Sequence, residues 1–131
     1  MSRIFVDGKQ ITTFYVSLFE SMKSETNFEE MLEKSGLTIR FILKDPDAEV
    51  FVAPGRVLVN DEINEEAIAK VECTADIAHA VWTRKMALTR AMATKKVKVN
   101  GPTIGIMKLV PALKPLFDVY PEHCKRNGIQ I

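Results

Sequence analysis

The chain has 131 residues, a formal net charge of +1 and an ordinary apolar share of 47%. This length fits one domain, which can bury a sizeable core without disulfides or metals. No apolar run reaches the roughly 18–20 residues that cross a bilayer, and the first ten residues lack the apolar region of a secretory signal. The sequence therefore excludes a membrane-spanning protein and predicts a globular, cytoplasmic one.

An apolar pattern near the amino terminus predicts a long amphipathic helix. Its large side chains recur at i, i+3, i+4, i+7, i+8 and i+11, at Ile11, Phe14, Tyr15, Leu18, Phe19 and Met22. A shorter helix is predicted to begin at Asn27, with Glu30 three residues later as in a capping box, and to end at Gly36.

The hydrophobic period then changes to two, which is typical of strands with one buried face. Residues 37–44, 49–53 and 57–59 predict an antiparallel meander, because turn residues separate them. A fourth strand is predicted over residues 67–74, after an acidic loop over residues 61–66.

The second half of the chain predicts three more helices. Asp76 is expected to cap the first, which runs through Val81, and a short helix follows over residues 87–94. After a fifth strand over residues 96–100, a last helix begins at Pro102, with apolar residues on nearly all sides, and Pro111 is expected to kink or stop it.

These elements predict an α+β fold, in which a five-stranded, mostly antiparallel sheet has helices packed on one face. Residues 1–131 form a single domain. Residues 1–117 are its predicted core, and residues 118–131 a polar carboxyl-terminal extension that includes Cys124. Two cysteines without a disulfide framework, Cys73 and Cys124, predict free thiols.

Charge is distributed unevenly along the chain. Residues 20–76 carry fourteen acidic and six basic residues, whereas residues 77–117 carry eight basic and no acidic residues. The favoured interpretation is that the two parts compensate each other in the fold. The alternative is a basic surface for an anionic partner, such as a membrane surface or the phosphates of an acyl-coenzyme A, with Arg84, Lys85, Lys95 and Lys96 as contacts. Nucleic acid is not expected, since aromatic residues are sparse among these cations.

Residues 73–117 resemble the sterol carrier protein type 2 family. That family has a helix ending in Thr-Gly-Lys, a Gly-Lys-hydrophobic-Lys-hydrophobic-x-Gly strand, and a helix containing Ala-Met-Lys-Leu. The matching positions here read Thr83-Arg84-Lys85, Lys95-Lys96-Val97-Lys98-Val99-Asn100-Gly101 and Ile106-Met107-Lys108-Leu109. Arg84 and Lys95 stand where the family has glycine.

The resemblance implies a non-catalytic carrier that holds a fatty acid, acyl-coenzyme A, isoprenoid or sterol-like ligand in an apolar tunnel between sheet and helices. The residues expected to line this tunnel are Phe14, Leu18, Phe19, Trp82, Met86, Met92, Ile104, Met107, Val110, Leu113 and Phe117. The same residues at helical spacing are also consistent with a simple core. A homodimer or a partner enzyme is a further possible assembly.

Two other functions are consistent with the sequence. A small enzyme of the ketosteroid-isomerase-like cone fold would need an acidic or phenolic group deep in a pocket, for which Tyr15 and Asp76 are the candidates. A scaffold module of the same fold would fill its tunnel with its own side chains. No cofactor or metal site is expected, because His79 is isolated and His123-Cys124 supplies two of the four ligands of a structural zinc.

Overall fold

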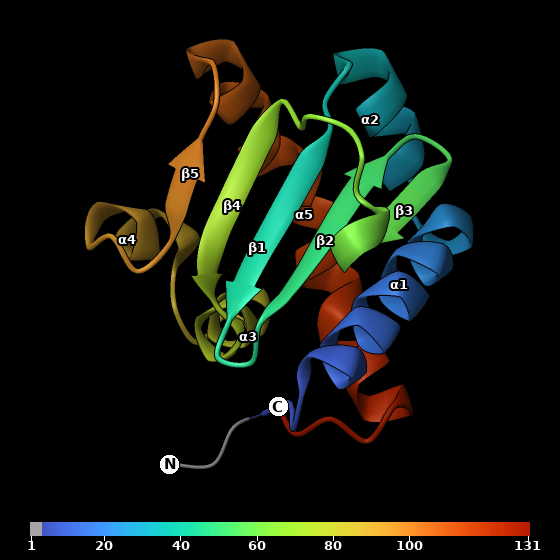
Figure 1. Ribbon diagram of the computed structural model, residues 1–131, viewed down its shortest axis with the longest axis vertical. Helices are drawn as coiled ribbons and strands as arrows, with labels where there is room; N and C mark the ends of the chain where they lie inside the picture. The colour runs from blue at the N-terminus through green and yellow to red at the C-terminus, as the bar shows by residue number, and fades with distance from the viewer. Residues whose placement is uncertain (1–3) are drawn as a thin grey trace.

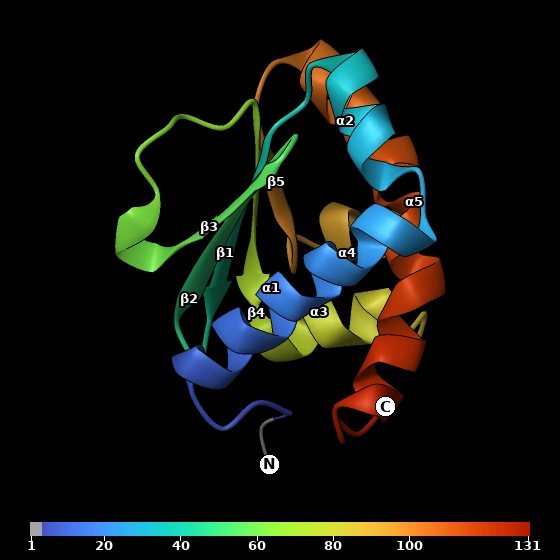
Figure 2. The same ribbon diagram turned by 90° about the vertical axis from the view of Figure 1, so that its right-hand side faces the viewer.

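A sheet forms one layer of the protein, and helices cover one of its faces (Figures 1 and 2). The computed structural model describes residues 4–131, so the first three residues of the predicted domain lie outside the described residues. In chain order the elements are α1 (Gly8–Glu25), α2 (Phe28–Ser35), β1 (Ile39–Lys44), β2 (Ala48–Ala53), β3 (Arg56–Val59), the short 3-10 helix η1 (Asn60–Glu62), β4 (Ala69–Thr74), α3 (Ala75–Trp82), α4 (Leu88–Ala93), β5 (Lys98–Asn100) and α5 (Thr103–Arg126).

The five strands are ordered β3-β2-β1-β4-β5 across the sheet. The pairs β1–β2, β2–β3 and β4–β5 are antiparallel, which confirms the predicted meander. The central pair β1–β4 is parallel, with Ile39 opposite Ala69, so the sheet is mixed and the prediction of a mostly antiparallel sheet is wrong. Alternating burial identifies a strand but does not indicate whether the neighbouring strand is parallel or antiparallel. That direction depends on the path of the chain between the two strands.

Helix α1 buries the whole apolar face that its periodicity predicts, from Ile11 to Met22. Asp7 caps its amino terminus by accepting a hydrogen bond from the Gln10 backbone N–H at 2.8 Å. At the start of α2 the predicted capping box is wrong, because the side chain of Asn27 makes no capping bond. Thr26 Oγ1 accepts the hydrogen bond from the Phe28 N–H instead.

Helices α3 and α4 each end in a Schellman motif. One residue of this motif is left-handed, and glycine adopts that conformation at the lowest free-energy cost. After α3, the N–H of Arg84 bonds to Val81 O and that of Lys85 bonds to Ala80 O. The equivalent bonds after α4 are made by the N–H groups of Lys95 and Lys96. Arg84 and Lys95 therefore take positive φ angles of 64° and 63°, in the left-handed region. These are the two positions at which the resembling family has glycine.

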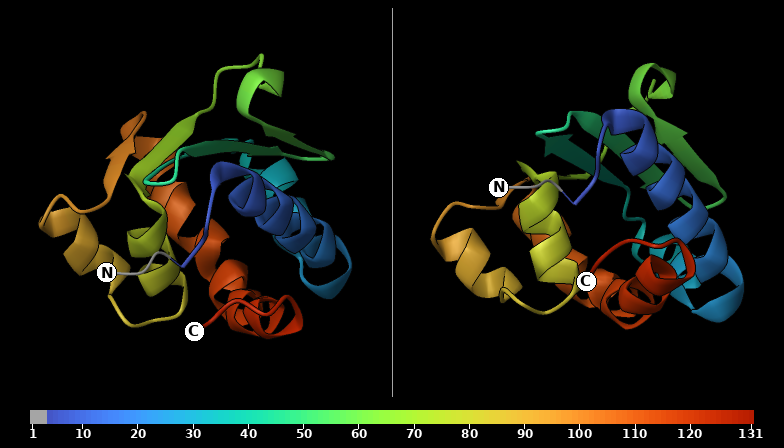
Figure 3. Two further views of the ribbon diagram at one scale, coloured as in Figure 1. Left: turned by 60° about the horizontal axis from the view of Figure 1, so that its bottom comes forward. Right: turned by 90° about the horizontal axis from the view of Figure 1, so that it is seen from below.

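Helix α5 is longer than predicted and contains Pro111, Pro115 and Pro121 within its span. Pro111 does not stop it, because the turns beyond it bury a continuous apolar face against α1 and α3 (Figure 3). That face includes Tyr120 and Cys124, which are fully buried, so the predicted boundary at Phe117 and the placement of Cys124 in a polar tail are wrong. The helix start of α3 is also corrected: Thr74, two residues before Asp76, accepts the capping bond from Ile77 N–H.

Candidate functional site

The interior between the sheet and helices α1, α3 and α5 is apolar and is the natural place for an apolar ligand. Five residues predicted to line it are buried there in one cluster: Phe14, Leu18, Phe19, Trp82 and Leu113. Three others, Met86, Met92 and Phe117, are partly buried and pack against the same cluster. Elements distant in sequence thus bring eight of the predicted side chains together.

A row of aromatic rings crosses this interior from α2 to α5. The ring of Phe19 stacks between those of Phe28 and Phe41, with centroid distances of 5.6 and 5.9 Å. Trp82 continues the row with edge contacts to Phe41 at 6.1 Å and to Phe117 at 5.4 Å. These rings occupy the space in which the tunnel was expected.

The predicted tunnel is not seen among the described residues. Two open surface grooves of about 450 and 490 Å³ lie beside α1 and α5, and of the predicted lining residues only Phe14 borders either of them. Phe19 borders an apolar slot between α1, α2 and the meander, whose volume of about 10 Å³ holds at most one water.

Three predicted lining residues lie on the outside of the protein instead. Ile104 is 65% exposed, Met107 70% and Val110 44%, so the prediction that they line the interior is wrong. Gly105 and Leu109 face inward in their place. The first half of α5 is apolar on both sides, and periodicity cannot say which side of such a helix is buried.

A chain of polar side chains runs through the buried end of the helical layer. The Trp82 indole donates to Tyr15 OH at 3.2 Å, and Tyr120 OH lies 2.9 Å from His79 Nδ1. Close by, Ser17 Oγ on α1 and His123 Nε2 on α5 form a hydrogen bond of 3.0 Å. The other ring nitrogens, His79 Nε2 and His123 Nδ1, make no side-chain hydrogen bond within residues 4–131; the backbone of Gln130 acts on the first ring and that of Phe14 on the second. The sequence patterns did not predict these hydrogen bonds, because Tyr120 and His123 lie beyond the predicted core.

Burial determines the ionisation of these groups. It raises the pKa of the Tyr15 and Tyr120 hydroxyls far above their usual range and lowers the pKa of both histidines. It also raises the pKa of the Cys73 thiol to about 12. Near neutral pH all five groups are therefore uncharged, and the buried polar chain acts as a hydrogen-bonded brace rather than as a source of an anionic nucleophile.

The candidates for the enzyme alternative do not form a reaction centre. Tyr15 is locked into the buried chain, whereas the Asp76 carboxylate accepts a hydrogen bond from the Ile4 backbone N–H at 3.2 Å. Within residues 4–131, no group of three His, Cys, Asp or Glu side chains is placed to hold a metal ion. None of the helices in this range combines the length and hydropathy needed to cross a membrane.

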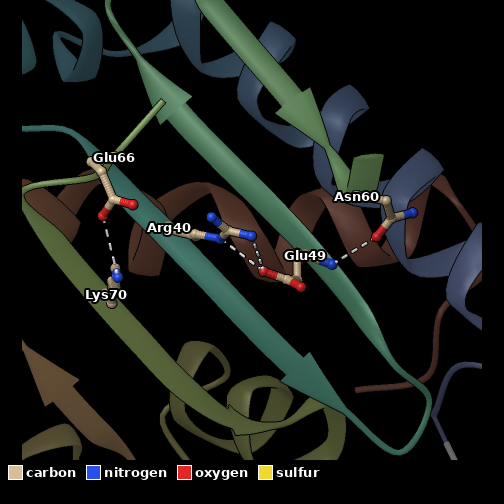
Figure 4. Close-up of polar contacts among 5 residues, drawn as sticks. All are labelled: Arg40, Glu49, Asn60, Glu66 and Lys70. Carbon is tan, nitrogen blue, oxygen red and sulfur yellow. Dashed lines mark hydrogen bonds and ion pairs between the residues drawn. The ribbon is translucent and has the colours of Figure 1, made fainter. Parts of the chain in front are cut away.

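All six cations of the acidic part, residues 20–76, form ion pairs with acids of the same part. On the outer face of the sheet Arg40 pairs with Glu49 at 2.6 Å and Lys70 with Glu66 at 3.4 Å (Figure 4). Asn60 Oδ1 accepts a hydrogen bond from the Glu49 N–H in the same group.

The basic part of the chain is left largely unpaired. Among residues 4–131, no ion pair joins a cation of residues 77–117 to an acid of residues 20–76. Only Arg84 pairs at all, with Asp118 at 3.1 Å. The favoured interpretation, that the two parts compensate each other, is supported at one place without an ion pair: the pKa of Glu72 is lowered mainly by Lys44 and further by Lys98, which lies opposite Glu72 in the β4–β5 pair.

Solved structures share this arrangement, which defines a small α+β domain. The sterol carrier protein domain 2 of Helicoverpa armigera superposes with a TM-score of 0.66 over 86% of this chain and 91% of its own, at 18% identity. The apo form of sterol carrier protein 2 from Yarrowia lipolytica gives 0.65 over 88% and 96%, also at 18% identity. A Thermus thermophilus protein described as possibly a sterol carrier protein gives 0.56 over 94% and 92%, at 14% identity.

The sequence itself gives the family. The model of the SCP-2 sterol transfer family matches residues 17–114, well over half of the chain. No curated protein matches the sequence. The chain belongs to the SCP-2 sterol transfer family, which confirms the resemblance drawn from residues 73–117.

Proposed function

We propose that the protein is a lipid carrier, which holds an apolar or amphiphilic ligand between its sheet and helices and transfers it without chemical change. The ligand classes are a fatty acid, an acyl-coenzyme A, an isoprenoid or a sterol-like molecule. The observation that carries the proposal is the convergence of Phe14, Leu18, Phe19, Trp82 and Leu113 in one apolar interior of an SCP-2 fold.

To enter this interior, a ligand would have to replace contacts between the rings of the aromatic row. Burying an acyl chain gains about 0.8 kcal/mol per methylene, and a bilayer offers the ligand a similar gain. The protein therefore needs to bind its ligand about as well as a membrane does and to open readily. Met86 and Met92 at the edge of the interior suit ligands of different shape, because methionine is flexible and polarizable.

Helix α5 is the proposed moving part. Each internal proline lacks the N–H that would bond four residues back, so the carbonyls of Met107, Pro111 and Phe117 lose their helical partner. Lys108 Nζ donates to the Ser35 carbonyl at 3.0 Å, an exposed bond that ties the first half of α5 to α2. We expect amide hydrogens of residues 104–117 to exchange faster than those of β1, and to slow when a lipid is bound. Equal protection of both elements, with and without lipid, would place the opening elsewhere.

Native mass spectrometry of freshly purified protein tests the carrier function. We expect a mass increment that is lost on organic extraction, and an extract that contains a lipid of one of the proposed classes. Titration with palmitate, palmitoyl-coenzyme A and cholesterol then ranks the classes. An apo mass that none of these ligands shifts would contradict the proposal.

The packed interior favours a scaffold as the second candidate function. In that case the aromatic row is a permanent core, and the fold serves association with other proteins. Substituting Phe19 by Ala separates the two functions. A carrier with a widened interior changes its ligand preference, whereas a scaffold without ligand only loses stability.

A further inference from the structure

Three of the six large apolar side chains that are exposed among residues 4–131 lie on one side of one helix. Ile104, Met107 and Val110 lie at i, i+3 and i+6 on the face of α5 that points away from the helical layer, and Pro111 is exposed beside them. We call these four residues the outer stripe of α5. Figure 2 shows α5 at the margin of the molecule, on the side opposite the sheet. A contiguous apolar surface of this kind marks an interaction site.

Cations that form no ion pair accompany the outer stripe, although Lys108 donates a hydrogen bond to the Ser35 carbonyl. Of the eight cations within residues 77–117, seven form no ion pair with any described residue; elsewhere in the described chain only Lys9 shares this property. Lys108 and Lys114 lie on α5 within the span of the stripe or just beyond it, and both are exposed. At the far end of the stripe, Arg84 packs its guanidinium 5.8 Å from the Phe117 ring.

Two cations of residues 77–117, of which Arg84 contacts α5, are held in an unfavourable backbone conformation. Arg84 and Lys95 occupy left-handed positions at which glycine would be more stable. Their side chains therefore stand beside the carboxyl ends of α3 and α4 at a conformational cost. The cost is consistent with a use for positive charge on this part of the surface.

We propose that the outer stripe of α5 docks on an anionic phospholipid bilayer, with its apolar side chains in the interfacial region and the surrounding lysines on the headgroup phosphates. This inference rests on the proposed carrier function, to which it adds the surface at which lipid is exchanged. A second copy of the chain fits poorly, because a symmetric contact would bring the unpaired lysines of both copies together. A bilayer receives apolar side chains and cations at once.

Co-sedimentation with vesicles tests the docking surface. We expect the protein to bind vesicles of phosphatidylcholine with phosphatidylserine, and to bind less at high salt or without phosphatidylserine. Met107→Asp should reduce binding at least about tenfold, and Lys114→Glu by about fivefold or more, since each cation near such a surface contributes about 1 kcal/mol. Both positions are exposed, so the thermal midpoints should stay close to that of the wild type.

Matched controls come from the amino-terminal end of the chain. Val6 is 72% exposed and Lys9 is the other unpaired cation, and both lie away from the stripe. Val6→Asp and Lys9→Glu repeat the same chemical changes and should leave vesicle binding unchanged. Binding by Met107→Asp equal to that of the wild type overturns the proposal. Self-association of the wild type in sedimentation equilibrium, if Met107→Asp abolishes it, also overturns the proposal. That result would assign the stripe to contact with a second copy of the chain.

The vesicle assay and the native mass measurement can fail independently. Vesicle binding that depends on Met107, with no ligand found by mass spectrometry, leaves the docking surface in place and contradicts the carrier. A co-purified lipid, with no binding to anionic vesicles, supports the carrier and overturns the docking surface.

Discussion

Helices α1 and α5 are both long and amphipathic, and they cross the same layer, yet they use their apolar residues differently. Helix α1 has one apolar face and buries all of it, from Ile11 to Met22. Helix α5 buries Leu109, Leu113 and Leu116 but turns Ile104 and Met107 outward. A helix with one apolar face has one way to pack, whereas a helix that is apolar on both sides keeps a surface free for another partner.

The largest expected effect contrasts equivalent truncations in the two helices. Leu18→Ala on α1 should lower the free energy of unfolding by about 3 kcal/mol, because it leaves a cavity in a packed core. Ile104→Ala on the outer stripe of α5 should change it by less than about 0.5 kcal/mol. Urea denaturation followed by circular dichroism measures both. A comparable loss in the two variants would mean that the outer stripe is packed in solution.

The buried polar chain, which joins α5 and α1 to α3, can be tested by removing one hydroxyl. Tyr120→Phe takes the hydroxyl partner away from His79 Nδ1 and leaves this buried ring nitrogen unsatisfied. We expect a loss of about 2 kcal/mol in the free energy of unfolding. In a His79→Leu background the same substitution should cost much less, because no imidazole remains to be left unsatisfied.

Acidification should weaken the contacts that α5 makes with α1 and α3. Burial lowers the folded-state pKa of His79 and of His123 below the ordinary value of 6.5. The unfolded chain therefore binds more protons, so stability is fully present above pH 6.5 and falls as the pH drops below it. Each histidine contributes up to about 1.4 kcal/mol per pH unit to this loss.

Unfolding curves between pH 7 and pH 5.5 measure the effect. Charged neighbours act on both rings: Arg126 and Glu25 oppose each other at His123, as Lys85 and Asp76 do at His79. The lowered pKa values of exposed carboxylates act only below about pH 4.5. In the double variant His79→Gln/His123→Gln, the free energy of unfolding should depend less on pH over this range. An unchanged pH dependence would mean that other groups cause the effect.

The smallest expected effect is a gain in stability. Lys95→Gly should raise the free energy of unfolding by about 0.5 kcal/mol, because glycine adopts the left-handed conformation of this Schellman position at less cost than lysine. Lys96→Gly, at the next residue and without a positive φ, should lower it instead. Thermal unfolding compares the two. If Lys95→Gly also weakens vesicle binding, the strained cation serves the docking surface.

The sequence allowed much of the fold to be predicted. The α1 face, the meander and the glycine at the end of α2 were right, because each rests on a local pattern or a local backbone requirement. Eight residues of the predicted interior also come together. The family resemblance was correct on short motifs, although two of their glycines are replaced by cations that keep the glycine conformation.

Three features depended on tertiary structure alone. The parallel β1–β4 pair results from the path of the chain after β3, which alternation within a strand does not encode. Helix α5 continues past its prolines because burial of Leu116 and Tyr120 offsets the lost backbone bonds. Its orientation, with Met107 outside and Leu109 inside, was decided by its neighbours. The sequence by itself determined which residues are apolar and how they repeat; the packed partners decided which of those residues remain at the surface, because burial is a property of the assembled layers.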